Sequence, residues 1–421
     1  MKLNRRKFLK YGSIGSLGLL PSISCNYFGE QERSIERDFF EIDKILSQPV
    51  MDLSVLKEPI IIASLELKRY KNNFICEVSS TSGAHGISVG NSDKLKSVWP
   101  VFYTRLQPYL IGKDVRDLEA IMEGIYLYKS NYKLQNLALW VPWATIEFAL
   151  LDMIGKIQNQ SIGQLLGEVH HPKISVYQAN NFRGKSAEES IELIKENVNA
   201  SAAKAVKFKV GGRMSKNKDF PNGRSEKLIP LVRETFGDDM TLYADSNGSY
   251  DVEEAIRIGK LLEEYNYDFY EEPVPFDWYE GTREVTRKLS VPVAGGEQEA
   301  SMRNFRWLIG NRALDIVQPD LFYFGGMIRS IKVARMSEAL NIPCVPHISG
   351  NGLGYLYMMH FVSCIPNAGP YHEFKGFNTQ IPYQCDTSKL TSNEGVVEVP
   401  KGPGLGITID PDFIKKHLTL Q

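Results

Sequence analysis

The chain has 421 residues, of which 43% are hydrophobic and 24% are charged, and its formal net charge at pH 7 is −1. This composition is typical of a soluble globular protein and excludes both a strongly basic nucleic-acid-binding protein and a disordered chain. No apolar run approaches the roughly 20 residues of a membrane-spanning helix, and the length accommodates an α/β barrel of about 250 residues together with a smaller domain.

Residues 1–25 have the pattern of an export signal. Residues 4–10 read NRRKFLK and precede a weakly apolar stretch at residues 11–20, which is similar to a twin-arginine signal and predicts a periplasmic protein. Cys25 is a candidate lipid anchor, and a basic disordered N-terminus is the alternative interpretation. The other cysteines lack the spacing of a metal site, so we expect free thiols at Cys76, Cys344, Cys364 and Cys385.

The next part of the chain predicts a polar linker at residues 26–55 and an α+β domain at residues 56–170. Residues 59–78 alternate apolar and polar residues, as short strands do. Residues 79–92 are rich in glycine and serine, so we expect a mobile loop. Amphipathic stretches at residues 114–129 and 143–158 predict helices.

From residue 171 to residue 384, short β-branched runs alternate with longer amphipathic stretches, which predicts βα units around a parallel sheet. Eight candidate strands lie at residues 174–178, 205–210, 241–245, 268–271, 292–294, 315–318, 344–346 and 371–373. Seven helical segments between them start near Ala187, Ser225, Val252, Tyr279, Glu299, Met327 and Gly352. This pattern predicts a (β/α)7β barrel, and because residues 385–421 contain no further βα unit, we expect them to return to the first domain.

Ionisable residues stand at the ends of six successive candidate strands. They are Asp245, Glu271, Glu297, Asp320, His347 and Glu373, and the steps between them are 23 to 27 residues, one βα unit each. A carboxylate after a strand is usually a helix cap or a surface charge. Since active sites of such barrels lie at the C-terminal ends of the strands, the series predicts that these side chains converge.

Three of these residues, Asp245, Glu271 and Glu297, end neighbouring strands. Three carboxylates in a partly dry pocket would repel one another strongly. A hard dication removes this conflict, and ligands that are all oxygen favour Mg²⁺ over Zn²⁺. The sequence therefore predicts a magnesium site.

One strand earlier, the alternation of a strand points Lys207 and Lys209 into the barrel mouth and Phe208 outward. An isolated pair of this kind is usually exposed, but opposite three carboxylates we expect it to be functional. A second ammonium and partial burial are expected to lower the lysine pKa toward the range of a general base. Across the barrel, Asp320 and His347 are expected to form a dyad in which the carboxylate orients the imidazole; a structural histidine bonded to backbone is the alternative.

Taken together, these motifs resemble the mandelate racemase group of the enolase superfamily. The matching motifs are Lys207-x-Lys209, Asp245-x-Asn247, Glu271-Glu272-Pro273, Gly296-Glu297, Pro319-Asp320, Pro346-His347 and Glu373. Residues 144–156 resemble the helix that joins the capping domain of this family to its barrel, and residues 402–406 resemble its closing segment. The resemblance implies a modified (β/α)7β TIM barrel with an α+β N-terminal capping domain that the C-terminal tail completes.

The resemblance also implies roles for individual residues. Asp245, Glu271 and Glu297 resemble the magnesium ligands, and Lys209 resembles the general base. Lys207 is similar to the residue that lowers the pKa of this base and faces the substrate carboxylate. Asp320 and His347 resemble the dyad on the opposite face, Glu373 resembles a group that binds a carboxylate oxygen, and Asn247 resembles a residue beside the metal. Residues 79–92 match the lid, where His85 is a candidate specificity contact; a solvated loop histidine is the alternative.

The activity implied is removal of the proton α to a carboxylate, which needs a metal and hydrogen-bond donors because the resulting anion carries two negative charges. We expect dehydration of an acid sugar to a 2-keto-3-deoxy acid. A racemase or epimerase would use the same residues, and a lactonising enzyme would carry a lysine where Asp320 and His347 stand. A non-catalytic binding protein is a further alternative, although none of the family's site residues is missing. A small carboxylate is the expected partner, and we expect a homo-oligomer.

Overall fold

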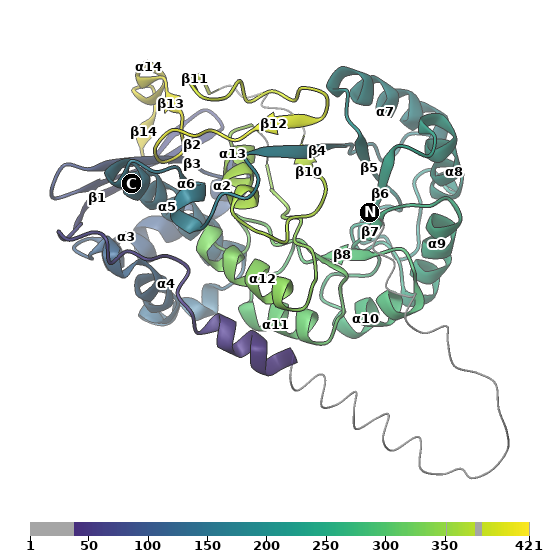
Figure 1. The fold of residues 1–421 in the computed structure, drawn as a ribbon, viewed down its shortest axis with the longest axis horizontal. Coiled ribbons are helices and arrows are strands. Elements are labelled where there is room, and N and C mark those ends of the chain that lie inside the picture. The colour runs from purple at the N-terminus through teal and green to yellow at the C-terminus, as the bar shows by residue number, and fades with distance from the viewer. Residues whose placement is uncertain (1–37, 351, 375–380, 421) are drawn as a thin grey trace, which may run out of the picture.

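The computed structural model describes residues 38–350, 352–374 and 381–420. The predicted export signal, Cys25 and the first part of the predicted linker lie outside the described residues. Figure 1 shows a barrel of strands surrounded by helices and, beside it, a smaller α+β part that also contains the last strand of the chain.

Seven parallel strands line the barrel in the order β10-β4-β5-β6-β7-β8-β9. Their bounds are β4 (Lys173–Ala179), β5 (Ala205–Lys209), β6 (Thr241–Asp245), β7 (Phe269–Glu271), β8 (Val293–Gly295), β9 (Ile316–Val317) and β10 (His372–Phe374). Cys344 closes the ring through isolated parallel bridges to Val317 and Ala368. The strand predicted at residues 344–346 is reduced to these bridges, because Pro343 and Pro346 have no N–H group to donate.

Within the part of the chain that the structure describes, seven helices surround the strands, as the spacing of the βα units predicts. They are α7 (Ala187–Ser201), α8 (Arg224–Phe236), α9 (Val252–Glu264), α10 (Tyr279–Lys288), α11 (Met302–Gly310), α12 (Met327–Ala339) and α13 (Gly354–Ser363). Helix α9 illustrates their origin, because Asp251 caps its first turn and its buried residues recur every three or four positions. Stacked rings of Tyr243 and Phe269, with centroids 3.7 Å apart, fill the barrel interior.

The capping part is a four-stranded antiparallel sheet with helices on it. The sheet has the order β14-β1-β2-β3, with β1 (Ile62–Tyr70), β2 (Asn73–Ser80), β3 (His85–Val89) and β14 (Leu418–Thr419). The helices are α2 (Ser92–Val101), α3 (Gln107–Leu110), α4 (Leu118–Leu127), α5 (Leu137–Gln158) and α6 (Ile162–Leu166), with shorter helical turns at Phe102–Leu106, Val115–Asp117 and Tyr128–Leu134. The expectation that no apolar run approaches a membrane-spanning length is wrong for α5, which alone among the described residues is long and apolar enough to cross a membrane. Inside the fold, 89% of its most apolar stretch is buried.

The expectation of a mobile loop at residues 79–92 is wrong. These residues complete β2, turn at Gly83 and continue as β3, where the backbone N–H of Ser80 donates to Ala84 (2.9 Å). A Cβ atom at Gly86 would overlap the carbonyl oxygen of Ala149 on α5. The small residues therefore let the strand approach this helix closely.

Part of the predicted linker is also structured, because residues 38–46 form a helix. Ile42 is fully buried, Phe39 contacts Gly310 of α11, and Asp43 accepts two hydrogen bonds from Arg306 (2.6 and 2.7 Å). The polar residues that suggested a linker lie on the outer side of a helix whose apolar side packs on the barrel.

The C-terminal tail contacts both parts of the fold. It contains β11 (Tyr383–Gln384), β12 (Val396–Glu398), β13 (Thr408–Ile409), α14 (Pro411–Ile414) and β14. Strand β12 pairs antiparallel with β4 of the barrel, β13 pairs with β11, and β14 pairs with β1 of the capping sheet. One hydrophobic core is continuous from the capping sheet through α5 to the barrel helices. The cysteines within the described residues are free, as expected: Cys76, Cys344, Cys364 and Cys385.

Candidate active site

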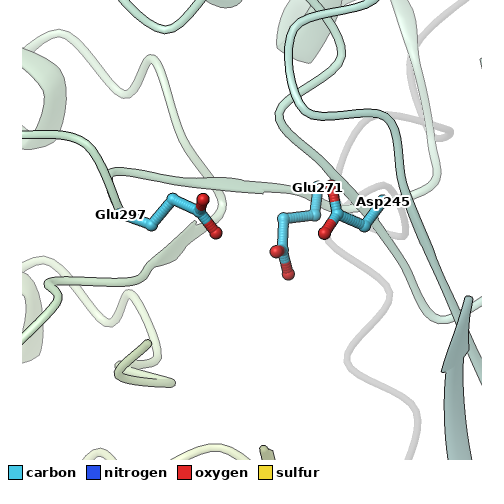
Figure 2. Close-up of side chains that lie close together, drawn as sticks. All are labelled: Asp245, Glu271 and Glu297. Carbon is cyan, nitrogen blue, oxygen red and sulfur yellow. The ribbon is translucent and has the colours of Figure 1, made fainter. Parts of the chain in front are cut away.

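Three carboxylates converge at the C-terminal ends of the barrel strands. Asp245 and Glu271 are paired residues at the ends of β6 and β7, and Glu297 follows β8. One oxygen atom from each lies within 4.8 Å of the others, and all three side chains are buried. Figure 2 shows Glu297 pointing toward Asp245 and Glu271 from the opposite side of a shared space.

These carboxylates fit a hard dication. Burial raises the pKa of Glu271, and the charges of Asp245 and Glu297 raise it further, although the charge of Lys207 opposes the rise. The three carboxylates therefore repel one another, and a cation bound between them would relieve this repulsion. Neighbouring groups also donate hydrogen bonds to these carboxylates: Asn247 N–H to Asp245 (2.9 Å), the Gln318 amide to Glu271 (2.8 Å) and the Gln298 amide to Glu297 (2.8 Å). Gln318 and Gln298 do not stand out in the sequence because amides at strand ends are common.

Lys207 and Lys209 point into the mouth from β5, as the strand alternation predicts, while Phe208 packs outward against Tyr267. The ammonium of Lys207 donates to both oxygens of Glu271 (2.7 and 2.8 Å), and Lys209 forms an ion pair with Asp245. Burial lowers the pKa of Lys207, but Glu271 and the other nearby anions outweigh burial and hold it well above its ordinary value. The nearest charges to Lys207 are therefore carboxylates, which keep its ammonium charged.

Asp320 and His347 form the predicted dyad. Nδ1 of His347 lies 2.6 Å from Oδ2 of Asp320. Asp320 is fully buried and also accepts hydrogen bonds from the backbone of Phe322 and Tyr323 (2.8 Å each) and from the backbone and hydroxyl of Ser349 (2.6 and 3.1 Å). This number of donors stabilises the ionised carboxylate, which in turn favours the charged imidazolium.

The free edge of His347 faces the carboxylate cluster. Its Nε2 lies 3.4 Å from Glu297 and 3.6 Å from Glu373. Burial lowers the pKa of His347, but Glu297, Glu373 and Asp320 raise it more, to about 10. Glu373 comes from β10 and is buried. The structure thus brings all six predicted strand-end residues and both lysines together.

Asn247 also lies at this site, in the left-handed backbone region at φ 44°. Its amide nitrogen donates to Glu272 (3.3 Å), and its amide oxygen accepts from Arg183 (2.9 Å) and Arg213 (3.2 Å). Both arginines lie in βα loops that show no regular pattern in the sequence, so no local signal indicates their position at the site.

His85 is not among the residues that the structure brings together. It starts β3, its imidazole is half exposed, and its partner is Glu77 of the capping sheet (3.4 Å). The other end of the strand, about 13 Å away at ~3.3 Å per residue, leads to Asn91 at the start of α2, which reaches the site. There the Asn91 amide donates to the hydroxyl of Ser349 (2.8 Å), which itself bonds Asp320. Asn91 therefore connects the capping part to the dyad.

Comparison with known proteins agrees with this geometry. Residues 189–413 match the family described as "Enolase C-terminal domain-like", and residues 49–167 match the mandelate racemase/muconate lactonizing enzyme N-terminal domain. Arabinonate dehydratase from Saccharolobus solfataricus is 26% identical over 74% of this chain and 81% of its own length. D-galactarolactone cycloisomerase from Agrobacterium fabrum is 29% identical over 73% of this chain and 81% of its own.

A similar fold is known from a crystal structure. The mandelate racemase/muconate lactonizing protein from Paracoccus denitrificans, solved in complex with magnesium, superimposes with a TM-score of 0.77. It is 24% identical, and the match covers 86% of this chain and 99% of that protein.

Proposed function

Because the chain belongs to the mandelate racemase/muconate lactonizing enzyme family of the enolase superfamily, we propose that it removes the proton α to a carboxylate with the help of Mg²⁺ and dehydrates an acid sugar. The observation that carries this proposal is the position of two proton-transfer groups, Lys209 and His347. They lie on different sides of the buried cluster formed by Asp245, Glu271 and Glu297. A substrate carboxylate at this cluster would have one such group toward each face.

Each residue of the site has a separate role in the proposed reaction. Mg²⁺ held by Asp245, Glu271 and Glu297 would supply charge stabilisation for the substrate carboxylate. Lys209 takes the α-proton onto its Nζ as the neutral amine, so its ion pair with Asp245 must first be broken and one ammonium proton released to solvent. His347 then donates the proton on Nε2 to the departing β-hydroxyl, which leaves as water. The resulting enol becomes the 2-keto-3-deoxy acid.

Further residues support these steps. The ammonium of Lys207 faces the same space and would bind the oxygens of the substrate carboxylate. Glu373 would donate a hydrogen bond to one of these oxygens in its protonated form. Asp320 keeps His347 oriented and favours its protonated form, which suits the acid that dehydration requires. A racemase or epimerase would use the same residues, and the similarity to arabinonate dehydratase supports dehydration.

The proposal is tested by incubating the enzyme and Mg²⁺ with a panel of sugar acids and measuring 2-keto acid and epimerised substrate. We expect keto acid with the wild type and none with Lys209→Ala or His347→Asn. Epimer without keto acid would replace dehydration by epimerisation. Full activity in EDTA would contradict the role of the metal, and activity in both variants would contradict the site.

We also propose that the protein is exported. The basis is the twin-arginine pattern at residues 4–10 and the cysteine at position 25. Expression of the full chain in bacteria with and without a functional twin-arginine pathway, followed by fractionation, tests the export. Mass spectrometry of the wild type and Cys25→Ser shows whether Cys25 carries a lipid.

A further inference from the structure

The segment between β5 and α8, residues 210–223, forms one wall of the barrel mouth. It has no regular secondary structure, but its backbone is fixed to the next βα loop. Met214 N–H donates to the carbonyl of Asn247 (2.9 Å), and Asn217 N–H donates to the carbonyl of Ser249 (2.8 Å). The segment is thus held beside the loop that carries Asn247.

Four non-glycine residues of this wall occupy the left-handed region: Arg213 (φ 62°), Met214 (φ 49°), Lys216 (φ 53°) and Asn217 (φ 66°). Each such residue is strained relative to ordinary backbone. Strain of this kind persists where surrounding contacts fix the chain, and it is concentrated at functional sites. One result of this conformation is the position of the Arg213 guanidinium.

The guanidinium groups of Arg213 and Arg183 both donate hydrogen bonds to one neutral oxygen atom. Both donate to Oδ1 of Asn247, at 3.2 Å and 2.9 Å, and Arg183 also donates to the carbonyls of Gly211 (3.2 Å) and Asp245 (3.5 Å). All these acceptors are uncharged, although two like charges so close together repel each other. Arg183 is half-buried and Arg213 is exposed, so Arg213 has the freedom to engage a ligand.

This pair stands directly beside the carboxylate cluster. Asn247, which both arginines contact, donates its own N–H to Asp245 (2.9 Å). The charge of Arg213 also lowers the pKa of Tyr323, although burial keeps that pKa high overall. Tyr323 N–H bonds Asp320, so Arg213 faces the same mouth as the dyad. An anion bound between Arg213 and the mouth would lie next to the site of chemistry.

We propose that Arg213, positioned with Arg183 through Asn247, binds a second carboxylate at the far end of the substrate. The preferred substrates are then sugar diacids (aldarates) and not the monoacids (aldonates) that end in a hydroxymethyl group. The two carboxyl carbons of an extended six-carbon diacid are about 6 Å apart for C–C bonds of ~1.5 Å, which suits adjacent subsites. The planar guanidinium matches a carboxylate with two parallel hydrogen bonds. This inference rests on the proposed function, because it assumes that the other carboxylate binds at the cluster.

The test compares each aldarate with the aldonate of the same configuration, such as galactarate with galactonate and glucarate with gluconate. These pairs differ only at the terminal carbon. We expect the ratio of kcat/KM for diacid over monoacid to be high in the wild type. It should fall about 10- to 100-fold in Arg213→Gln, which is the range for losing a hydrogen bond to a charged group.

Two further variants sharpen the comparison. Arg213→Lys keeps the charge but cannot form two parallel hydrogen bonds. Its ratio of kcat/KM for diacid over monoacid should lie between those of the wild type and Arg213→Gln. Arg287→Gln removes an exposed arginine from the outer end of α10 and should leave the ratio unchanged. A wild-type ratio near one, or an equal ratio in the wild type and Arg213→Gln, would overturn the inference.

A failure of the proposed chemistry would look different. If no sugar acid yields keto acid, calorimetric titration of the same pairs into the wild type and Arg213→Gln, with Mg²⁺ present, still tests the subsite. Tighter binding of diacids that Arg213→Gln abolishes would support the inference. Equal binding of both acids would overturn it.

Discussion

Glu147 of α5 is a buried carboxyl group at the junction of the capping part and the barrel. It is fully buried, and its Oε1 accepts a hydrogen bond from Ile328 N–H (2.8 Å) in the first turn of α12. Gly326 makes room for it, because a Cβ there would overlap the Glu147 carboxylate. Helix α12 follows the loop that starts at Asp320, so this contact holds the backbone that carries the dyad.

Burial raises the pKa of Glu147 from 4.5 to about 8, although the Ile328 N–H and the charge of Arg329 oppose the rise. The folded protein therefore binds more protons than the unfolded chain between these two values, and its stability falls as pH rises through this window. The stability contributed by the protonated Glu147 carboxyl group is complete below pH 4.5 and is lost as pH rises to about 8. Over the whole window it amounts to about 5 kcal/mol, at about 1.36 kcal/mol per pH unit.

Glu147→Gln keeps the acceptor for Ile328 N–H and removes the titration. Between pH 5.5 and 7.5, the unfolding free energy of the wild type should fall by about 2.7 kcal/mol relative to the variant. Urea denaturation followed by circular dichroism at five pH values measures this difference. Glu123→Gln, which changes an exposed glutamate of α4, is the matched control. Its unfolding free energy should change with pH in the same way as that of the wild type. Parallel curves for the wild type and Glu147→Gln would refute the assignment of a neutral buried carboxyl group.

Two further substitutions test the site. Lys207→Met leaves the buried Glu271 charge without its partner, so the unfolding free energy in EDTA should fall by about 3–5 kcal/mol. Mg²⁺ should restore part of this loss. Equal losses with and without Mg²⁺, measured by thermal melting, would contradict the proposed metal site. Asn91→Ser keeps a side chain that can cap α2 but cannot reach Ser349, so kcat should fall about fivefold for a lost bond of ~1 kcal/mol. The melting temperature should fall by no more than a few degrees. An unchanged kcat and pH profile would show that Asn91 does not position the dyad.

The sequence predicts the barrel and the residues at its strand ends well, for a physical reason. Parallel strands bring their C-terminal ends to one side of the barrel, so a periodic series such as Asp245, Glu271 and Glu297 implies proximity without further knowledge. Strands buried on both faces and capped amphipathic helices are equally local signals. These features need only short-range patterns in the chain.

Features that depend on distant contacts were not predictable in this way. Asn91 and Ser349 are 258 residues apart, and nothing local to either indicates their hydrogen bond. Residues 79–92 have the composition of a loop, but their small side chains serve close packing on α5. Arg213 owes its position to a left-handed backbone in an irregular segment, and propensities do not specify such a conformation.

Release of label from the α carbon tests the central claim most directly, because dehydration and epimerisation both require it. Sugar acids deuterated at C2 are incubated with the wild type, Lys209→Ala, His347→Asn or the double variant, each with Mg²⁺ and with EDTA. Mass spectrometry then follows deuterium in the substrate and the product. The account predicts that the wild type with Mg²⁺ releases deuterium to water and that the double variant and the EDTA samples do not. Undiminished release by the double variant, or turnover of a sugar acid by the wild type with its C2 deuterium retained, would contradict it.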